Sequence, residues 1–391
     1  MVTMSSADNA LKTLYLGVVT EQINTNANPL LAKIRQSTSD VWGKEIKRLA
    51  QYGVNGGVGA GTETGSLPSA AGNNYEQFTL SLKNLYGSIE LSDKAIRASE
   101  NNAGAFVNLL NAEMEGLLKA ASFNFGRMLY GDGSGTLATV SSVSGNNVTV
   151  SSVKNLVEGM IIDFRAAADG SVLASSGGRR ITAIDRANKI ITVSGATLNS
   201  SVVVANSLIT VQGSYNQEIT GLGAIFKTSG SIYGLSRSTH KWLIPYIRTS
   251  VGSITESVIQ TAIDELEENA GSNVNFIVCS SGVKRAFMNH LATYKRNTDY
   301  MELAGGYKAI SYNGIPIVSD RFCPEGTMYL LNTDDFTLHQ LCDWKWLEGE
   351  DGKVLKQIAG TPSYSATLVK YADLICAKPC GQAMLTGITE A

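Results

Sequence analysis

The pattern of apolar and polar positions is most regular between residues 103 and 130. Apolar side chains recur there at intervals of three or four, which is the spacing of one face of an α-helix. The stripe consists of Phe106, Leu110, Met114, Leu117, Ala121, Phe125 and Met128. A helix from Ala103 to Tyr130 would be on the order of 42 Å long, which is unusual in a compact domain. The pattern predicts one long amphipathic helix.

The residues before this helix divide into an arm and a hairpin. Two helix-like patches, around Asn9–Gln22 and Leu30–Leu49, are separated by a polar break. They have too few apolar positions for a core of their own, so we expect an arm that packs on something else. Further on, Phe78, Leu80 and Leu82 alternate with polar residues, as on a half-buried strand.

Residues 53–74, GVNGGVGAGTETGSLPSAAGNN, contain seven glycines and no lysine, arginine or histidine. We interpret this stretch as the tip of a long hairpin. Glycine loses much backbone entropy on ordering, so a loop this rich in glycine is expected to be held by something outside it, in our interpretation a neighbouring subunit. The residues expected at that contact are Gly53, Asn55, Gly56, Gly57, Gly59, Gly61, Glu63, Gly65 and Pro68.

The same glycines raise the alternative of a phosphate-binding loop, because glycine-rich turns that open a helix can present backbone N–H groups to phosphate. No Gly-Lys-Ser/Thr sequence follows them, and Pro68 and Gly72 interrupt the downstream side. The next periodic segment alternates like a strand, whereas a nucleotide fingerprint needs a helix there. The sequence therefore argues against nucleotide binding.

After the long helix, short Val, Ile and Thr runs divided by glycine and asparagine continue to about residue 215. Val140 and Val148 lie on either side of one turn signal at residues 145–147, and Ile184 and Ile190 lie on either side of another. At least two hairpins are expected. A small β-barrel or sandwich, inserted into a larger fold, fits this pattern best.

From residue 221 onward, helical and strand patterns alternate. Ser253 and Glu256 have the spacing of a capping box, and Gly271 is placed to end the helix that follows. Ser281 is expected to cap a second helix. Buried strands are expected at Phe276–Cys279, Ile315–Val318 and Met328–Leu331. The alternation predicts an α/β or α+β domain.

Strand patterns return near the C-terminal end. Cys342, Trp344 and Trp346 are expected on one face of a strand, with the tryptophans in a core rather than on a ligand platform. Val354–Ile358 and Ala366–Cys376 are expected to pair as a long antiparallel ribbon after a turn at residues 350–352. A last short strand is expected at residues 383–388.

Composition limits the class of protein. With 391 residues, 43% hydrophobic and 17% charged, the chain is long enough for two or three packed units. A net charge of -2 argues against nucleic-acid binding through overall basic charge. The first fifty residues have a small basic excess that would suit an arm near a polyanion, although a solvated surface is the simpler interpretation. These basic residues are Lys12, Lys33, Arg35, Lys44, Lys47 and Arg48.

No catalytic, cofactor or metal site is predicted. His240, His290 and His339 are far apart in the sequence and belong to no catalytic motif, so each is expected at the surface or in a satisfied polar contact. Five irregularly spaced cysteines are expected to be reduced. Cys376 and Cys380 could supply two zinc ligands, but no second pair accompanies them. No run of residues has the length and apolarity of a membrane span or signal peptide.

The order of these parts is specific: an arm, a glycine-tipped hairpin, a long helix, a β insertion, an α/β domain and a β ribbon. It resembles the major capsid protein of tailed bacteriophages, which has the Hong Kong 97-type fold. The likeness is carried by QYGVNGGVGAGTETGSLP with LKNLYGSIELSDKAIRAS, by NGIPIVSDRFCPEGTMYLLN, and by DWKWLEGEDGKVLKQIAGTPSYSATLVKYADLICAKPCGQAMLTGI.

The resemblance implies an α+β fold with a definite division of the chain. The expected parts are an N-terminal arm (1–50), an E-loop hairpin (51–91), a P-domain spine helix region (92–135), an inserted β domain (136–215), an A-domain (216–340), and a P-domain β-ribbon whose final strand returns to the A-domain (341–391). In the family, the arm and the E-loop lie across neighbouring subunits. The glycine loop would then be ordered by a neighbour.

The resemblance also implies a structural role. The chain would not be an enzyme but would assemble into hexamers and pentamers of an icosahedral shell around a phage genome. It would be located in the virion capsid and assembled in the host cytoplasm. Its expected partners are itself, a portal protein, a possible decoration protein, and packaged DNA through weak non-specific contact only, with no membrane.

Two departures from the family matter. No lysine lies between Lys47 and Lys83, so we predict no isopeptide bond between an E-loop lysine and a P-domain asparagine. Little sequence precedes the arm, so a separate scaffolding protein is expected. An encapsulin-like nanocompartment is the main alternative, followed by a hydrolase or nucleotide-binding enzyme and then by a surface-layer protein.

Overall fold

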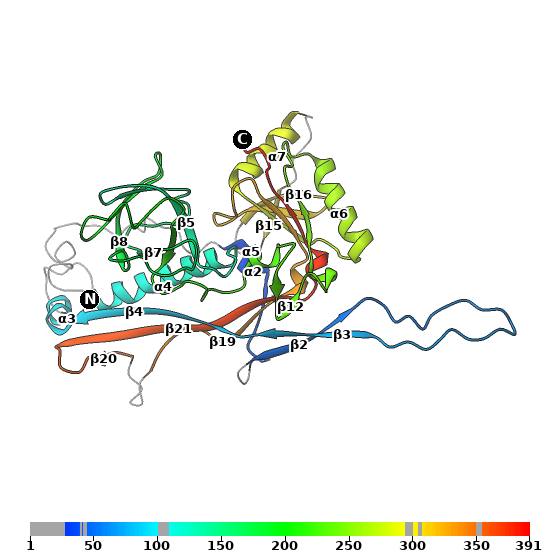
Figure 1. Ribbon diagram of the computed structural model, residues 1–391, viewed down its shortest axis with the longest axis horizontal. Coiled ribbons are helices and arrows are strands. Elements are labelled where there is room, and N and C mark those ends of the chain that lie inside the picture. Colours follow the sequence, from blue (N-terminus) through cyan, green and yellow to red (C-terminus); the bar gives the residue numbers. More distant parts are fainter. Residues whose placement is uncertain are drawn as a thin grey trace. The chain divides into compact units, whose positions relative to one another are not determined.

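The computed structural model describes residues 28–39, 41, 45–100, 109–293, 300–303, 307–348 and 354–391. Their contacts divide the chain into two compact units. The first contains the described residues up to 31, those of 83–222 and those of 341–372. The second contains those of 32–82, 223–340 and 373–391. Figure 1 shows the elements of both units along the chain.

The first unit is built on a ladder between β4 (Lys83–Ser92) and β21 (Ser363–Cys376), which pair antiparallel from Ser92↔Ser363 to Lys83↔Ala372. The short β20 (Lys356–Gln357) pairs with the start of β21. Helix α3 (Asp93–Glu100) follows β4 directly, and the Ser92 hydroxyl accepts a hydrogen bond from Ala95 N. Ser92 therefore has the contact of a helix N-cap.

Helix α4 (Leu109–Met128) packs its apolar stripe against this ladder. Leu110, Met114 and Leu117 pack on a core that includes Ile89 and Leu91. The side chains of Ala121, Phe125 and Met128 are buried. The predicted amphipathic helix is therefore confirmed over α4, and the first part of the predicted range, with Phe106, lies outside the described residues.

The β insertion is a closed six-stranded barrel with strand order β10-β5-β6-β9-β8-β7 (Figure 1). Its strands are β5 (Thr136–Ser144), β6 (Asn147–Val150), β7 (Ile161–Arg165), β8 (Arg179–Asp185), β9 (Ile190–Val193) and β10 (Leu208–Val211). Both predicted hairpins are present, as β5–β6 and β8–β9. Alternate side chains such as Val148, Ile162 and Ile209 are fully buried and form one apolar core inside the barrel.

The second unit contains a seven-stranded sheet of order β13-β22-β18-β14-β17-β16-β15. Its strands are β13 (Tyr246–Arg248), β14 (Phe276–Cys279), β15 (Tyr300–Leu303), β16 (Tyr307–Tyr312), β17 (Ile315–Ser319), β18 (Met328–Leu331) and β22 (Ala383–Leu385). Helices α6 (Glu256–Ala270) and α7 (Ser281–Thr293) share one apolar core with it, to which Ile259 and Phe287 contribute. The expected buried strands at β14, β17 and β18 are confirmed.

Two smaller groups of strands complete this unit. The hairpin of β2 (Ile46–Tyr52) and β3 (Asn74–Leu80) is paired along its whole length. Strand β1 (Arg35–Ser37) pairs parallel with the first part of β19 (Phe336–Trp346). The remaining elements are α2 (Pro29–Lys33), α5 (Leu222–Ile225), β11 (Ser231–Ile232), β12 (Leu235–Ser236), and the 3₁₀ turns η1 (Lys241–Leu243), η2 (Thr333–Asp335) and η3 (Pro379–Gly381).

The predicted helix at Leu30–Leu49 is wrong. Among the described residues of this range, only those that belong to α2 are helical, and the chain then enters β1 and β2. Within β2, Ile46 and Ala50 are buried, and the strand is stabilised by its pairing with β3. Residues four apart lie on one side of both a helix and a strand, so this apolar spacing could not distinguish the two. The patch at Asn9–Gln22 lies outside the described residues.

Both predicted helix caps in the α/β region were misplaced. Helix α6 is capped by Thr255, whose hydroxyl accepts a hydrogen bond from Val258 N at 3.3 Å, and not by Ser253. Helix α7 is capped by Ser280, whose hydroxyl accepts from Val283 N at 3.4 Å. A cap must directly precede the first helical residue, and these polar-rich loops offer several candidates. The predicted stop of α6 at Gly271, in the left-handed conformation, is confirmed.

The prediction that Val354–Ile358 is the main partner of Ala366–Cys376 in a long ribbon is also wrong. Strand β20 makes only two pairs with β21, whereas β4 is the partner along most of that strand. Because β4 is distant in sequence, local alternation could not reveal this pairing. The expected turn at residues 350–352 lies outside the described residues. The alternation of Cys342, Trp344 and Trp346 along β19 is confirmed.

Candidate intersubunit hairpin

The base of the β2–β3 hairpin is fixed by an aromatic cluster in the second unit. Phe78 on β3 is 1% exposed, and its ring lies 5.2 Å from that of Tyr233 and 5.7 Å from that of Trp242. Tyr52 stacks on Trp242 at 5.3 Å with an interplanar angle of 7°. The backbone N–H of Thr79 donates to Tyr233 O at 3.0 Å. These contacts hold the root of the hairpin rigidly.

Tyr233 is itself anchored by its phenol group. The hydroxyl donates to Leu374 O at 3.2 Å and accepts from Cys376 N at 2.9 Å. Burial raises the pKa of Tyr233 well above its ordinary value, and burial likewise raises the pKa of the Cys376 thiol. Both groups are therefore neutral near pH 7, which fits the buried, reduced thiol expected for Cys376.

Beyond the paired strands, residues 53–73 form an open loop whose two legs are joined by polar side chains. The Asn55 side chain accepts from Gly57 N at 2.9 Å and donates to Asn73 at 3.3 Å. A turn at the end of the loop is closed by a bond from Gly65 N to Thr62 O at 3.1 Å. Of the predicted contact residues, Asn55 thus has a role within the loop.

Most glycines of this loop contribute their small size rather than an unusual backbone conformation. Among them only Gly53 has a positive φ, of 66°. Added side-chain atoms would instead crowd the opposite leg: a Cβ at Gly57 would lie 3.2 Å from Ala71 N, and one at Gly59 would lie 3.2 Å from Pro68 Cγ. Small size at these positions lets the legs approach each other closely.

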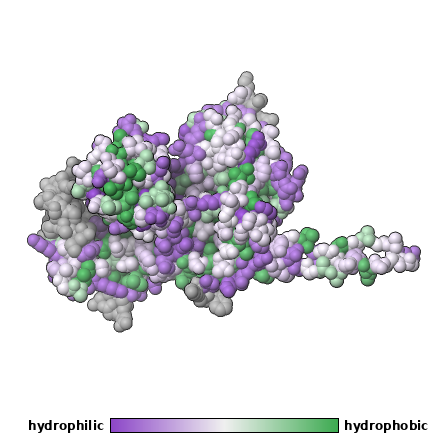
Figure 2. All heavy atoms as spheres, in the orientation of Figure 1, coloured by the Kyte–Doolittle hydropathy of each residue, from purple (hydrophilic) through white to green (hydrophobic). Residues whose placement is uncertain are grey.

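The exposed apolar side chains are the feature that sequence reasoning missed. Val54, Val58 and Leu67 are 82%, 87% and 89% exposed, and Leu49 and Tyr75 are at least half exposed. These five are among only twelve exposed large hydrophobic residues in the described part of the chain. Figure 2 shows apolar patches along the loop. Solvent-exposed apolar groups gathered on one element mark an interaction surface.

All of the predicted contact residues lie on this loop, and Glu63 is its only charged side chain. The alternation of Val54, Val58 and Leu67 with glycines is visible in the sequence, so a search for apolar residues within a glycine-rich segment could have found them. We refer to Val54, Val58 and Leu67 as the apolar tip. Within the described part of the chain the apolar tip stays exposed, so it offers a surface for contact with another molecule.

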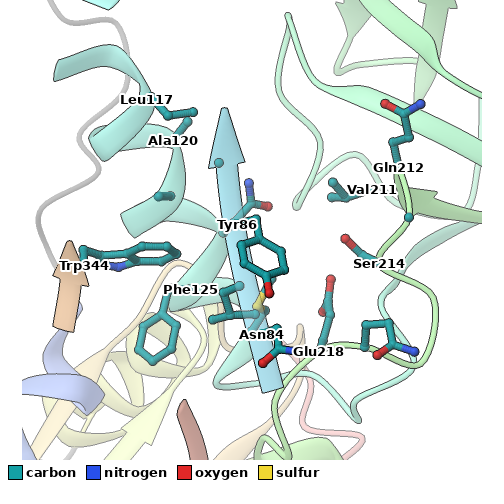
Figure 3. Close-up of a pocket in the computed structure, with 17 residues that line it drawn as sticks. Asn84, Tyr86, Leu117, Ala120, Phe125, Val211, Gln212, Ser214, Glu218 and Trp344 are labelled. Carbon is teal, nitrogen blue, oxygen red and sulfur yellow. The ribbon is translucent and has the colours of Figure 1, made fainter. Parts of the chain in front are cut away.

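A separate pocket of about 360 Å³ lies within the first unit, between α4, β4 and residues 211–218 (Figure 3). Its apolar side is formed by Leu117, Phe125 and Trp344. Its one acidic group among the described residues, Glu218, is buried and holds Arg127 through two hydrogen bonds of 2.6 and 2.9 Å. The carboxylate therefore serves as a structural ion-pair partner.

The described residues that line this pocket include no histidine or cysteine. An acid–base or nucleophile–base pair needs two suitable groups within hydrogen-bond reach, and the one carboxylate of this pocket is already bonded to Arg127. Elsewhere in the described part of the chain, no cluster of His, Cys, Asp and Glu has the make-up of a metal site. His339 is buried on β19 rather than at the surface, while His240 and His290 are half-buried. No described helix combines the length and apolarity needed to cross a membrane.

Comparisons with known proteins rest on structure alone, since neither a protein-family model nor a curated protein sequence matches the chain. A chain of the Cyanophage A-1(L) capsid asymmetric unit matches with a TM-score of 0.59 at 14% identity, covering 100% of both chains. The capsid of an empty GTA particle, computed with C5 symmetry, matches with a TM-score of 0.54 at 10% identity, covering 99% of this chain and 98% of that one.

A third solved structure is the holo-SrpI encapsulin complex from Synechococcus elongatus PCC 7942. It matches with a TM-score of 0.51 at 9% identity, covering 99% of this chain and 96% of the encapsulin chain. At identities this low, the likeness concerns the fold, and it extends over nearly the full length of each chain. The fold resemblance inferred from the sequence is confirmed at that level.

Proposed function

We propose that this chain, which has the Hong Kong 97-type fold, is a major capsid protein that assembles into hexamers and pentamers of an icosahedral shell around a phage genome. The full-length likeness to the cyanophage capsid chain carries this proposal. The apolar tip supports it, because a subunit that exposes such residues on an extended loop is suited to repeated contact with copies of itself.

In this proposal the loop of the β2–β3 hairpin belongs to the E-loop and α4 is the spine helix. The glycine-rich loop and its apolar tip lie against a neighbouring subunit, where Val54, Val58 and Leu67 leave water. The predicted contact residues Gly53, Asn55, Gly56, Gly57, Gly59, Gly61, Glu63, Gly65 and Pro68 then shape and present the loop. Obligate contacts of this kind bury on the order of thousands of Å² between subunits.

The parts of the chain are assigned as the sequence suggested. Residues 1–50 form the N-terminal arm, 51–91 the E-loop region, 92–135 the spine region, 136–215 the inserted barrel, 216–340 the A-domain, and 341–391 the ribbon of the P-domain with a final strand that returns to the A-domain. A separate scaffolding protein and a portal protein assist assembly. The barrel is not needed for the shell and offers a place for a decoration protein.

An encapsulin-like shell is the second candidate. The match to the SrpI encapsulin complex favours it, because its TM-score of 0.51 is close to that of the GTA capsid at 0.54. The two functions differ in what the shell encloses: nucleic acid in one and a cargo protein in the other. Either is a structural role, with the subunit as a building block and no reaction to catalyse.

Electron microscopy of the purified chain, alone and with a candidate scaffolding protein, tests the proposal together with light scattering. Closed shells, tubes, or rings of five or six subunits are expected. A stable monomer or small dimer under all conditions would contradict it. Shells purified from the native source should contain nucleic acid; particles that contain a protein cargo and no nucleic acid would favour the encapsulin function.

A further inference from the structure

A cavity of about 320 Å³ lies at the base of the hairpin, within the second unit. Two groups of strands that do not pair with each other line it: β2 on one side, and β1 with β19 on the other. The residues that form it are Arg35, Ile46, Lys47, Arg48, Leu49, Thr337 and His339. Thr337 and His339 are buried, whereas Arg35 and Lys47 are exposed.

The lining of this cavity is strongly basic. Three of its side chains are cationic and none is a carboxylate. Within the part of the chain that the structure describes, Arg35, Lys47 and Arg48 make no side-chain hydrogen bond or ion pair. Arg48 does act at longer range on Asp335, where its charge lowers a pKa that burial raises.

Cations that line one cavity without an ion-pair partner among the described residues, such as Arg35 and Lys47, repel each other, and a bound anion relieves that repulsion. The donors also fit a phosphate group. Arginine presents a planar fork of N–H donors that matches two oxygens, lysine adds a point charge, and a hydroxyl such as that of Thr337 can donate as well. We propose that this cavity binds an oxyanion, and that its ligand is a backbone phosphate of nucleic acid.

Two observations favour a phosphate on a polymer over a free ion. Arg35 and Lys47 lie at the exposed rim, so the cations can follow a strand that passes over the surface rather than enclose a dehydrated ion. The chain as a whole has a net charge of -2, so attraction to a polyanion must come from local groups. The basic excess seen in the first fifty residues is concentrated here, with three of its six members on one cavity.

The oxyanion site itself does not depend on the shell function; only the choice of packaged nucleic acid as the biological ligand rests on that proposed function. Binding of a short fluorescein-labelled DNA duplex to the full-length chain can be followed by fluorescence anisotropy at about 50 and about 200 mM salt, where phosphate contacts weaken steeply. The test variant is Arg35→Gln with Lys47→Gln. Lys33→Gln, an exposed lysine on α2, is the matched control.

The double variant should bind the duplex at least tenfold more weakly at the lower salt concentration. Its slope of log affinity against log salt should be smaller by about 0.9 for each lost phosphate contact, equally for unrelated DNA sequences. Lys33→Gln should bind as the parent does, and circular dichroism should show that both variants are folded. Inorganic phosphate should compete with the duplex for the parent chain.

Three results would overturn the inference. Equal binding of the DNA duplex by the parent and the double variant would show that the cavity is not the binding site. Binding of inorganic phosphate without binding of DNA would remove nucleic acid as the ligand. Unchanged DNA binding combined with impaired assembly would mean that a carboxylate of a second copy occupies the cavity. Shell formation is scored separately by electron microscopy, so failure of this site and failure of the proposed function are distinguishable.

Discussion

The apolar tip leads to a quantitative prediction about assembly. Val58 and Leu67 are 87% and 89% exposed in the single chain, so replacing both with serine removes almost nothing from its core. Fully burying one such side chain is worth about 1.5–3 kcal/mol. If both are buried against a neighbour, the double variant loses about 3–6 kcal/mol per hairpin contact, which corresponds to roughly a 10²- to 10⁴-fold weaker contact.

The assay compares the subunit concentration at which particles first form, measured by light scattering, for the parent and Val58→Ser with Leu67→Ser. We expect this threshold to rise at least tenfold. The free energy of unfolding of the unassembled subunit, from urea denaturation, should change by no more than about 0.5 kcal/mol, as for other exposed positions. Val204→Ser, at a half-exposed position outside the hairpin, should leave both quantities unchanged.

A threshold that stays within a factor of two of the parent value would refute the reasoning, because it would mean that the tip remains in water in the particle. Loss of stability in the unassembled double variant would refute it in another way, since the tip would then belong to the fold of the subunit. Phe78→Ala provides the contrast. This substitution removes a buried ring from the aromatic cluster at the base of the hairpin and should destabilise the subunit by about 3–5 kcal/mol.

Three further predictions concern the subunit alone. Glu218→Gln leaves the buried charge of Arg127 unpaired and should lower the free energy of unfolding, measured by urea denaturation, by about 3–5 kcal/mol. Glu158→Gln, in an exposed ion pair, should change the same quantity by less than about 1 kcal/mol. Gly221→Ala should yield insoluble protein on expression, because the added Cβ would meet three backbone carbonyl oxygens, one of them at 2.7 Å. Gly116→Ala, where the added Cβ on α4 meets open space, should instead raise the free energy of unfolding by about 0.5–1 kcal/mol. Burial raises the pKa of Asp335, so the contribution of this carboxyl group to stability is greatest below its unfolded pKa of about 3.9 and is lost as pH rises through the folded pKa. The free energy of unfolding of the parent minus that of Asp335→Asn should therefore fall over that pH window. A difference that does not change with pH would contradict the raised pKa.

Much of the fold could be predicted where local pattern and tertiary role agree. The stripe of α4 was visible because its buried positions, such as Ala121 and Phe125, follow the helical period. The barrel was visible because its hairpins are local, with tight turns between strands that pair directly. The left-handed stop at Gly271 follows from the chemistry of glycine alone. In each case the residues that decide the structure are neighbours in sequence.

The errors arose where residues that are distant in sequence decide the local structure. The helical prediction at Leu30–Leu49 failed because pairing with β3 outweighs the local preference of β2. The wrong partner for β21 has the same origin, since β4 lies more than 250 residues before it along the chain. The basic cavity could not be predicted either: Lys47 and Arg48 are adjacent in sequence, but only the fold brings Arg35 and Thr337 to them.

The hairpin shows why a candidate contact surface was only half visible in sequence. Its abundance of glycine drew attention to this segment, and the structure adds what the glycines do, since only Gly53 uses the positive φ that glycine permits. Gly57 and Gly59 instead let two legs of the loop lie close together, which leaves the larger side chains no inner face to occupy. Val54, Val58 and Leu67 must then point outward. The small residues and the exposed apolar residues thus act together, because a loop this thin does not bury its own apolar groups among the described residues.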